Sequence, residues 1–241
     1  MITRIKWSLA KSTALNEMKN AKLNLLAIIL LTSFGACSKN SNLPLPRSSN
    51  EVFSPKSSVA ERPFAENAPR ETRLIVESAR RQTQITKIYD QAYVVLDYPN
   101  GDVSAERGAC TDVVIRALRA AGVDLQKEVY EDISGNFTVY PKKWGLKKPD
   151  KNIDHRRVPN LQTFFARRGK SVPATNNSAD YKPGDIVTWD LNGKGLTHVG
   201  VVSNLWHEQT KRFLIIHNIG RGAEAEDVLF DWQITGHYRY F

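Results

Sequence analysis

Apolar residues recur at helical spacing in three stretches of the first 170 residues. Over 71–89 they fall three or four positions apart with charged residues between them, which predicts an amphipathic helix. A second pattern of this kind starts at Cys110 and stops at Gly122, a residue type that commonly ends helices. A shorter apolar cluster over 161–169 predicts a third, short helix. We therefore expect Cys110 at the N-terminus of a helix.

The last third of the chain has a different pattern. Short apolar runs alternate with turns that contain Gly, Asn or charged residues, which predicts strands. The stretch 123–159 between the two patterns is rich in Lys, Arg, Asp and Pro, and we interpret it as a long insertion around a groove. Helices first and strands later predict an α+β domain. The predicted strands are 185–190, 197–203, 213–219 and 234–240.

The first 36 residues have the layout of a secretion signal. Lys19 and Lys22 precede an apolar run over 25–31, and small residues follow it. This run is shorter than the roughly 20 residues that span a bilayer, so we expect a cleaved signal, with an uncleaved anchor as the alternative. Met18 is an alternative start, because the segment from there to residue 36 already contains a complete signal.

The end of this signal resembles a bacterial lipobox, with Phe34 at a place where leucine is usual. The resemblance implies that Cys37 is lipidated and becomes the N-terminus after cleavage. Residues 37–70 are rich in Ser, Asn and Pro and lack sustained periodicity, which predicts a flexible tether. We expect the folded domain to occupy 71–241 and the lipid to hold it on the periplasmic side of a membrane.

The charge of the chain favours an anionic partner. The full sequence carries +9, and removing the five basic residues and one acidic residue of the first 36 positions leaves +5. In an exported protein this excess suits an anionic polymer or a membrane surface. The sequence has no nucleic-acid-binding motif and no paired-ligand spacing such as C-x-x-C that would indicate zinc. We expect no nucleic-acid partner, no metal and no cofactor.

The chain has two cysteines. If Cys37 carries a lipid, Cys110 has no partner for an internal disulfide in an oxidising compartment. A helix N-terminus favours a thiolate, because unpaired backbone amides and the helix dipole stabilise negative charge there. We interpret Cys110 as a catalytic nucleophile whose thiol has a lowered pKa. A small buried core residue and a disulfide between the two cysteines are the alternatives.

Two histidines stand on adjacent predicted strands. His198 lies two residues before Gly200, and His217 follows an aliphatic run over 213–216. If these strands pair antiparallel, side chains across them lie about 5 Å apart. A polar group near His217 can then orient His198 as the general base for a cysteine. Either histidine alone is compatible with a core role, whereas two on paired strands, with an unpaired thiol elsewhere, favour catalysis.

A set of segments together resembles the NlpC-type papain-like cell-wall peptidases. They supply a cysteine that opens a helix, a Pro-Gly-Asp turn before a strand, and histidines on two later strands. More closely, the chain resembles a poorly characterised family of exported bacterial proteins near those peptidases, over roughly Arg70 to Phe241. The resemblance implies a papain-like fold in which the nucleophile helix packs on a small antiparallel sheet. The segments that carry it are 107–112, 152–160, 183–189, 198–202 and 216–218.

The same resemblance implies roles for individual residues. Cys110 is then the nucleophile, His198 the general base and acid, and His217 the polar residue that orients His198. Asn218 is the alternative orienting residue, and strand alternation places it on the opposite face from His217. Tyr98 stands where a tyrosine of the peptidase group lines the oxyanion site, with ordinary core packing as the alternative.

Four further residues bear on the substrate. Ala109 occupies the place where many of these peptidases carry an aspartate that contacts the free amine of the stem peptide, so peptide specificity is open. Arg156 and Arg157 are candidates to hold a substrate carboxylate through their planar guanidinium groups, with simple exposure to solvent as the alternative. For His155 a functional and a core interpretation both stay open.

These features predict a cysteine hydrolase that cleaves an amide bond in peptidoglycan, within the stem peptide or between the sugar and its first alanine. Attack by Cys110 would give a thioester that water cleaves with His198 as base. Two alternatives stay open: transfer of the acyl group to an amine, as in an acyltransferase or deamidase, and a lipid-anchored wall-binding protein without activity. Ser38 does not suggest retention at the inner membrane, which favours the outer one. The sequence does not fix an oligomeric state.

Overall fold

The computed structural model describes residues 58–241. The predicted secretion signal, Cys37 and most of the predicted tether lie outside these residues. β1 (Val59–Glu61) pairs antiparallel with the far end of β5 (Thr197–His207), so the chain is already part of the fold at this point. The predicted domain boundary at residue 71 is therefore corrected, because a strand pair holds the residues before it.

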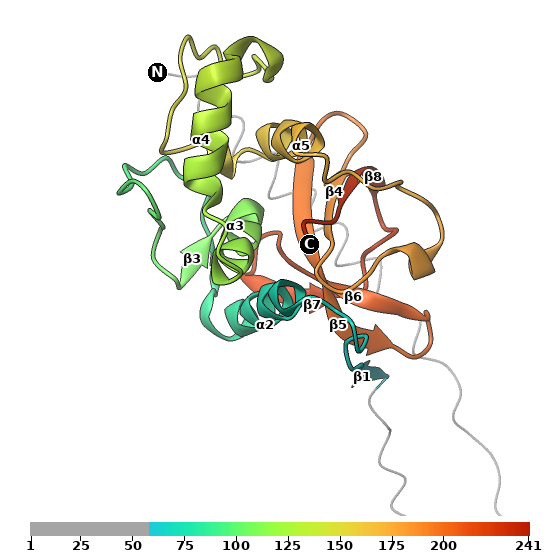
Figure 1. The fold of residues 1–241 in the computed structure, drawn as a ribbon. Coiled ribbons are helices and arrows are strands. Elements are labelled where there is room, and N and C mark those ends of the chain that lie inside the picture. Colours follow the sequence, from blue (N-terminus) through green and yellow to red (C-terminus); the bar gives the residue numbers. More distant parts are fainter. Residues whose placement is uncertain (1–57) are drawn as a thin grey trace, which may run out of the picture. The chain divides into compact units, whose positions relative to one another are not determined.

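Three of the helices in the described residues match the sequence prediction (Figure 1). They are α2 (Arg70–Ile85), α3 (Cys110–Ala120) and α5 (Val158–Arg167). Glycines follow two of them, Gly122 with φ +88° and Gly169 with φ +66°. Glycine adopts this left-handed conformation without steric cost, so it ends a helix readily. The prediction of a cysteine at a helix N-terminus is confirmed.

α4 (Leu125–Asn136) lies in the stretch 123–159, for which the sequence pattern predicts an insertion and no helix. Leu125, Val129 and Ile133, at four-residue spacing, are buried. Asp124 caps the first turn by accepting a backbone N–H at 3.1 Å. The prediction missed this helix because the charged residues on its exposed side dominate the composition of the stretch. Three short 3₁₀ helices complete the chain: η1 (Phe137–Val139), η2 (Asp154–Arg156) and η3 (Ser178–Asp180).

The longer strands form one antiparallel sheet. Besides β1 and β5 it contains β4 (Ile186–Asp190), β6 (Arg212–Asn218), β7 (Ala223–Glu226) and β8 (Gln233–Tyr238). The strand order is β7-β6-β5-β4-β8, with β1 paired to β5. The sequence did not predict β7, whose four residues alternate alanine and glutamate and carry no large apolar side chain. The two strands that carry the histidines are antiparallel neighbours, as predicted.

The core has two parts, one on each face of the sheet. On one face Val199 and Val201 of β5 pack with residues of α2, α3 and α5. On the other face Val187, Trp189 and Val202 form a second apolar cluster that connecting segments cover. Figure 1 shows the helices gathered on one side of the strands. The α+β class predicted from the sequence is confirmed. None of the described helices is long and apolar enough to cross a membrane.

Candidate active site

Polar contacts within the chain fix the position of Cys110, which is 7% exposed. α3 starts at this residue because Ala109 is extended and its N–H donates to Asp112 Oδ2 at 2.5 Å, the carboxylate half of a capping box. Arg156 holds this carboxylate in turn, with Nε and Nη2 each 2.9 Å from one of its oxygens. Gly108 leaves the necessary space, since a Cβ there would lie 2.9 Å from Asp112 Cβ.

The start of α3 lies against the ends of β5 and β6, beyond the paired register of these two strands. Here Asn218 Nδ2 donates to Gly108 O at 2.8 Å. The Val199 backbone amide lies close enough to the Cys110 sulfur to lower the pKa of the thiol. Val199 shares the core on the helix side with Cys110, whereas the side chain of the preceding His198 points to the opposite face and packs with Trp189. No direct hydrogen bond joins the Cys110 and His198 side chains in the described structure.

His198 on β5 and His217 on β6 are joined directly, with Nε2 of the first 2.8 Å from Nδ1 of the second. Both rings are buried. Gly200 makes room for this approach, because a Cβ there would lie 2.6 Å from Ile215 Cγ2 and 3.1 Å from His217 Cβ. Trp232 packs edge-to-face against both rings, with centroids 5.9 and 6.1 Å away. The prediction that paired strands bring the two histidines together is confirmed.

Burial dominates the electrostatics of these groups. It raises the pKa of Cys110 to about 12, although the N–H groups of Val199 and Thr111 lower it. It lowers the pKa of His198 to about 3, with a further lowering from the neighbouring His217 ring. The lowered thiol pKa expected at a helix N-terminus is therefore corrected, because the loss of hydration outweighs the helix dipole. The resting pair is a neutral thiol and a neutral imidazole.

Tyr89 is a site residue that the sequence did not reveal. The parallel pairing of β2 (Ile88–Tyr89) with β3 (Arg107–Gly108) sets Tyr89 opposite the glycine two residues before the nucleophile. Burial raises the pKa of Tyr89, and the acidic groups of Cys110 and Asp112 raise it further. The phenol hydroxyl therefore lies within electrostatic reach of the thiol.

The prediction for Tyr98 is corrected. Its ring packs edge-on against Tyr130 of α4, with centroids 5.4 Å apart, which is a packing role. The helix predicted over 71–89 includes Tyr89, whereas α2 ends at Ile85 and Tyr89 lies in the two-residue strand β2. The parallel pairing of β2 with β3 is a long-range contact that leaves no pattern in the local sequence.

Arg156 and Asn218 support the backbone of the site and do not face the histidine pair. The prediction of a substrate clamp is corrected for Arg156, whose side chain is 2% exposed and bound to Asp112. Its guanidinium also donates to two backbone carbonyls of the segment 90–92, at 2.8 and 3.2 Å. Asn218 points to the opposite face from His217, as strand alternation predicted.

Arg157 and His155 are also engaged away from the histidine pair. Arg157 donates to Asp154 Oδ1 at 3.0 Å and lies over the Trp144 ring at 4.2 Å. His155 is buried, and burial together with the charge of Arg156 lowers its pKa to about 3, which makes it a neutral core residue. Residues 58–241 contain no group of three or more His, Cys, Asp or Glu side chains placed to hold a metal.

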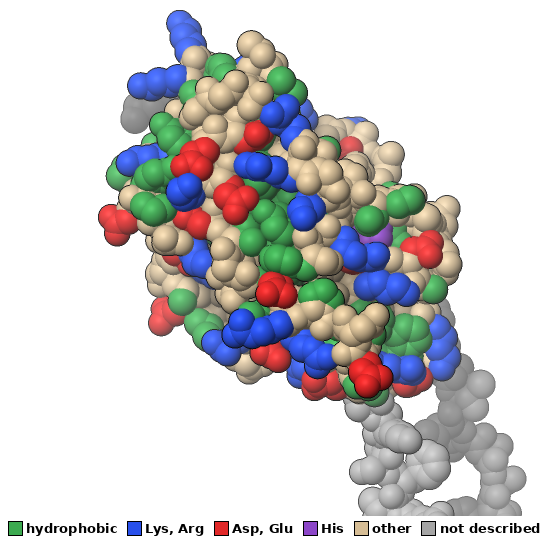
Figure 2. Space-filling model, viewed as in Figure 1, with side chains coloured by type: hydrophobic (Ala, Val, Ile, Leu, Met, Phe, Trp, Pro, Cys, Tyr) green, Lys and Arg blue, Asp and Glu red, His purple; other side chains and the backbone are tan. Residues whose placement is uncertain are grey.

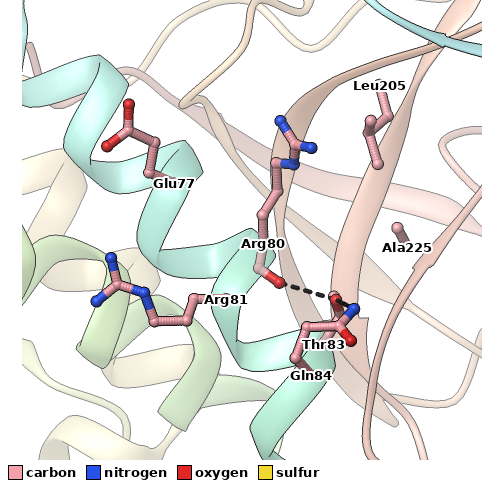
Figure 3. A pocket seen from close by; sticks show the side chains of 7 residues that line it. All are labelled: Glu77, Arg80, Arg81, Thr83, Gln84, Leu205 and Ala225. Carbon is pink, nitrogen blue, oxygen red and sulfur yellow. Dashed lines mark hydrogen bonds between the residues drawn. The ribbon is translucent and has the colours of Figure 1, made fainter.

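A separate pocket of about 400 Å³ lies between α2 and the sheet (Figure 3). It reaches β7 from the face opposite the histidines and contains neither of them, nor Cys110. One of its arginines, Arg80, is already paired with Glu61 at 2.6 Å. The pocket is lined by Glu77, Arg80, Arg81, Thr83, Gln84, Leu205 and Ala225.

The fold and the site define an α+β domain with a buried cysteine at a helix N-terminus on one face of the sheet and a bonded histidine pair on the other face. The chain belongs to the DUF1287 family, a domain of unknown function, whose sequence model matches residues 76–240. The uncharacterized protein YijF of Escherichia coli (strain K12) is 58% identical to it over 167 residues, which cover 69% of this chain and 80% of that protein. Membership of a poorly characterised bacterial family, predicted from the sequence, is confirmed.

Two solved structures are similar to the chain at low identity. NlpC1 from Trichomonas vaginalis shares 12% identity with a TM-score of 0.38 over 73% of this chain, which spans only 46% of that protein. An N-acetylmuramoyl-L-alanine amidase from Bacteroides uniformis ATCC 8492 shares 13% identity with a TM-score of 0.43, over 70% of this chain and 98% of the amidase. The chemistry proposed below rests on the residues of this chain.

Proposed function

We propose that the chain is a cysteine hydrolase that cleaves an amide bond in peptidoglycan. The observation that carries the proposal is the 2.8 Å hydrogen bond between His198 and His217 on β5 and β6, the strands against whose ends the N-terminus of α3 with Cys110 packs. A nucleophile, a base and a group that orients the base are the parts that acyl transfer through a thioester requires.

His198 is the base in this proposal and works through its free nitrogen. His217 occupies Nε2 of His198, so Nδ1 is the nitrogen that can accept a proton. The Cys110 sulfur attacks the substrate carbonyl carbon while the thiol proton moves to Nδ1. The same proton then passes to the departing amine as the C–N bond breaks, which leaves a thioester. Water next attacks the thioester, gives a proton to Nδ1, and releases the acid and the thiol.

The oxyanion of the tetrahedral intermediate needs hydrogen-bond donors near the sulfur. The backbone N–H groups of Cys110 and Thr111 lie at the N-terminus of α3 and lower the pKa of the thiol. The Tyr89 hydroxyl, which donates to Gln91 Oε1 at 3.4 Å at rest, is a third donor that could turn to the oxyanion. Donors that are fixed before the reaction stabilise charge as it develops. Because thiol and imidazole are both neutral at rest, the proton transfer accompanies the attack.

The charge of the chain and its proposed location favour an anionic wall polymer as the substrate. In Figure 2 basic and acidic side chains are interspersed over the visible face, without a continuous basic stripe of the kind that nucleic acids require. A modest excess of +5 without the first 36 residues suits an anionic wall polymer. We further propose that Cys37 carries a lipid that holds the domain beside the wall, which mass measurement of the mature N-terminus and a Cys37→Ala variant test.

The test of hydrolysis is digestion of purified sacculi with the chain and with Cys110→Ala as the matched control. The chain is expected to release soluble fragments, and mass spectrometry identifies the new amine and carboxyl ends. Cys110→Ala is expected to release none while keeping its circular dichroism spectrum. Equal release by both proteins, or no release by either one, contradicts the proposal.

A wall-binding protein without activity is the second candidate, because Cys110 is buried and its pKa is raised to about 12. The two candidates differ in what sacculi do to the thiol. A hydrolase forms a thioester, so a brief incubation followed by acid quench leaves an acyl group on Cys110. A binding protein sediments with sacculi and leaves the mass of Cys110 unchanged.

A further inference from the structure

β7 places a carboxylate at the far end of the histidine pair. Glu226 Oε2 lies 3.0 Å from His217 Nε2, the ring nitrogen that His198 does not use. The contact is bent, since Nε2 has no well-aligned hydrogen-bond partner among the described residues. The His217 side chain is 1% exposed and that of Glu226 is 32% exposed, so the carboxylate lies on the solvent side of a buried imidazole.

The neighbours of Glu226 leave this oxygen to His217. Arg221 Nη2 lies 3.3 Å from the other oxygen, Oε1, and 2.9 Å from Glu224 Oε2. Glu224 is directly opposite His217 in the register of β6 and β7, yet its carboxylate makes no hydrogen bond or ion pair with that ring in the described structure. Both glutamates raise the pKa of His217 by their charge, but only Glu226 contacts the ring, so Glu224 is a control for the charge without the contact.

The hydrogen-bond chain has one arrangement that leaves a base for the thiol. A neutral imidazole donates from one nitrogen and accepts at the other. If His217 donates its Nε2 proton to the carboxylate, its Nδ1 accepts, so His198 donates from Nε2 and keeps a lone pair at Nδ1. In the reverse arrangement His198 carries its proton at Nδ1 and cannot accept another. A carboxylate can only accept, so Glu226 selects the first arrangement.

We propose that Glu226 is a positioning residue that sets the ring protons of the His198–His217 pair and so keeps a lone pair at His198 Nδ1, where the ring can act as a base. This inference rests on the proposed function. Glu226 takes up no proton itself: the thiol proton stays on His198 until the leaving amine accepts it. The electrostatics agree, because burial lowers the pKa of His217, whereas the Glu226 carboxylate raises it by charge and hydrogen bonding and Glu224 raises it to a smaller extent by charge alone.

Ring-nitrogen NMR of the ¹⁵N-labelled chain tests the proposal without turnover. In the wild type both rings are expected to carry their proton at Nε2. Glu226→Ala is expected to give a mixture with a population protonated at His217 Nδ1. Glu226→Gln keeps an amide oxygen that can accept, so it should fall between these two. Glu224→Gln is expected to match the wild type.

Kinetics on sacculi give the second readout. Glu226→Ala is expected to lower kcat about tenfold with KM little changed, because misplaced ring protons affect the chemical step and not substrate binding. Glu226→Gln should restore part of this loss, and Glu224→Gln should leave the rate unchanged.

Two results overturn the role of Glu226. One is a His217 ring protonated at Nδ1 in the wild type, and the other is ring signals that stay unchanged in both Glu226 variants. If Glu226→Ala does not fold, Glu226→Gln decides alone. If the chain releases no fragments from sacculi, the hydrolase proposal is contradicted. The NMR measurement of the ring protons does not need turnover, so it still tests the role of Glu226 and the two failures are distinguishable.

Discussion

Two buried histidine sites lie on the same face of the sheet, one on each side of β4. His198 on β5 shares a hydrogen bond with His217 and makes no other side-chain hydrogen bond in the described structure. His237 on β8 uses both ring nitrogens, with Nε2 2.8 Å from Asp185 Oδ2 and Nδ1 2.9 Å from Pro173 O. The first site keeps a nitrogen for chemistry, whereas the second keeps none.

The difference between the two sites is one of partners and not of burial, since His198 is 3% and His237 is 2% exposed. Asp185 also binds Arg239 through both carboxylate oxygens, at 2.7 Å each, so His237 belongs to a charged cluster that is satisfied within the fold. Tyr181 stacks on the His237 ring at 4.3 Å and completes its surroundings. A buried histidine therefore indicates chemistry only where one ring nitrogen lacks a fixed partner.

The largest expected effect separates the sites by activity. His198→Gln is expected to lower fragment release from sacculi by about 10³-fold or more, since it removes the base of a thioester mechanism. His237→Gln should keep the rate per folded molecule within about twofold, because no step uses that ring. Comparable losses in both variants would mean that the distinction between the sites is wrong.

Stability is expected to show the opposite order. His237→Gln should lower the free energy of unfolding by about 3 kcal/mol, because it breaks a buried contact with a charged carboxylate. His198→Gln should cost less, since its ring has one neutral partner. Urea unfolding of both variants at pH 7.5 measures the difference. An equal loss of stability would contradict the prediction that His237 contributes more to the fold than His198 does.

Gly200 tests whether the histidine pair depends on backbone space. Gly200→Ala places a methyl group 2.6 Å from Ile215 Cγ2 and 3.1 Å from His217 Cβ, so His217 must shift. A loss of about 2 kcal/mol in stability is expected from the overpacking, together with about a tenfold loss of activity from the displaced ring. Gly135→Ala is the control for adding a methyl group without a clash, because Gly135, like Gly200, has no positive φ and a Cβ there meets no atom within 4 Å.

The dependence of the free energy of unfolding on acid pH tests whether the buried histidines stay neutral in the native state. Burial holds the pKa of His198 and of His155 near 3 in the native state, below the ordinary value of 6.5. Below pH 6.5 the unfolded chain therefore takes up a proton at each ring that the native chain does not. The free energy of unfolding should fall by about 1.4 kcal/mol per pH unit for each ring as the pH drops from 6.5 toward 3. Above pH 6.5 these rings contribute no slope.

The control for this dependence is His155→Leu, measured by urea unfolding at pH 7 and pH 5. This variant should remove the part of the pH dependence that comes from His155 and keep the part that comes from His198. An unchanged difference between the two pH values would show that His155 takes up its proton in the native state as well.

The smallest effect is expected at the exposed end of the histidine pair. Arg221 is 72% exposed and binds Glu224 and Glu226. Arg221→Ala should change the free energy of unfolding by less than about 0.5 kcal/mol, because exposed ion pairs are screened by water and salt. A larger loss, measured by the same urea titration, would mean that β7 depends on this arginine.

Local patterns in the sequence predicted the parts of the site that lie on regular elements. Apolar spacing placed Cys110 at a helix start, and alternation together with strand pairing placed His198 beside His217. The residues that were assigned wrongly depend on long-range contacts. The local sequence around Arg156 is that of an exposed arginine, and only the ion pair with Asp112 of another helix explains its burial.

β7 is the clearest case of a missed element. Its alternation of alanine and glutamate gives no apolar signal, and only the pairing with β6 brings Glu226 to His217. The thiol pKa was misjudged for a related reason: the helix dipole can be inferred from sequence, whereas the degree of burial cannot.

The burial of Cys110 has a consequence for the lifetime of the protein. Oxidation of a cysteine to sulfenic and higher acids proceeds through the thiolate and requires access to the oxidant. A sulfur that is 7% exposed, with its pKa raised to about 12, offers little of either. In the oxidising compartment proposed for this chain, the same burial would preserve the reactive form of Cys110 between encounters with substrate.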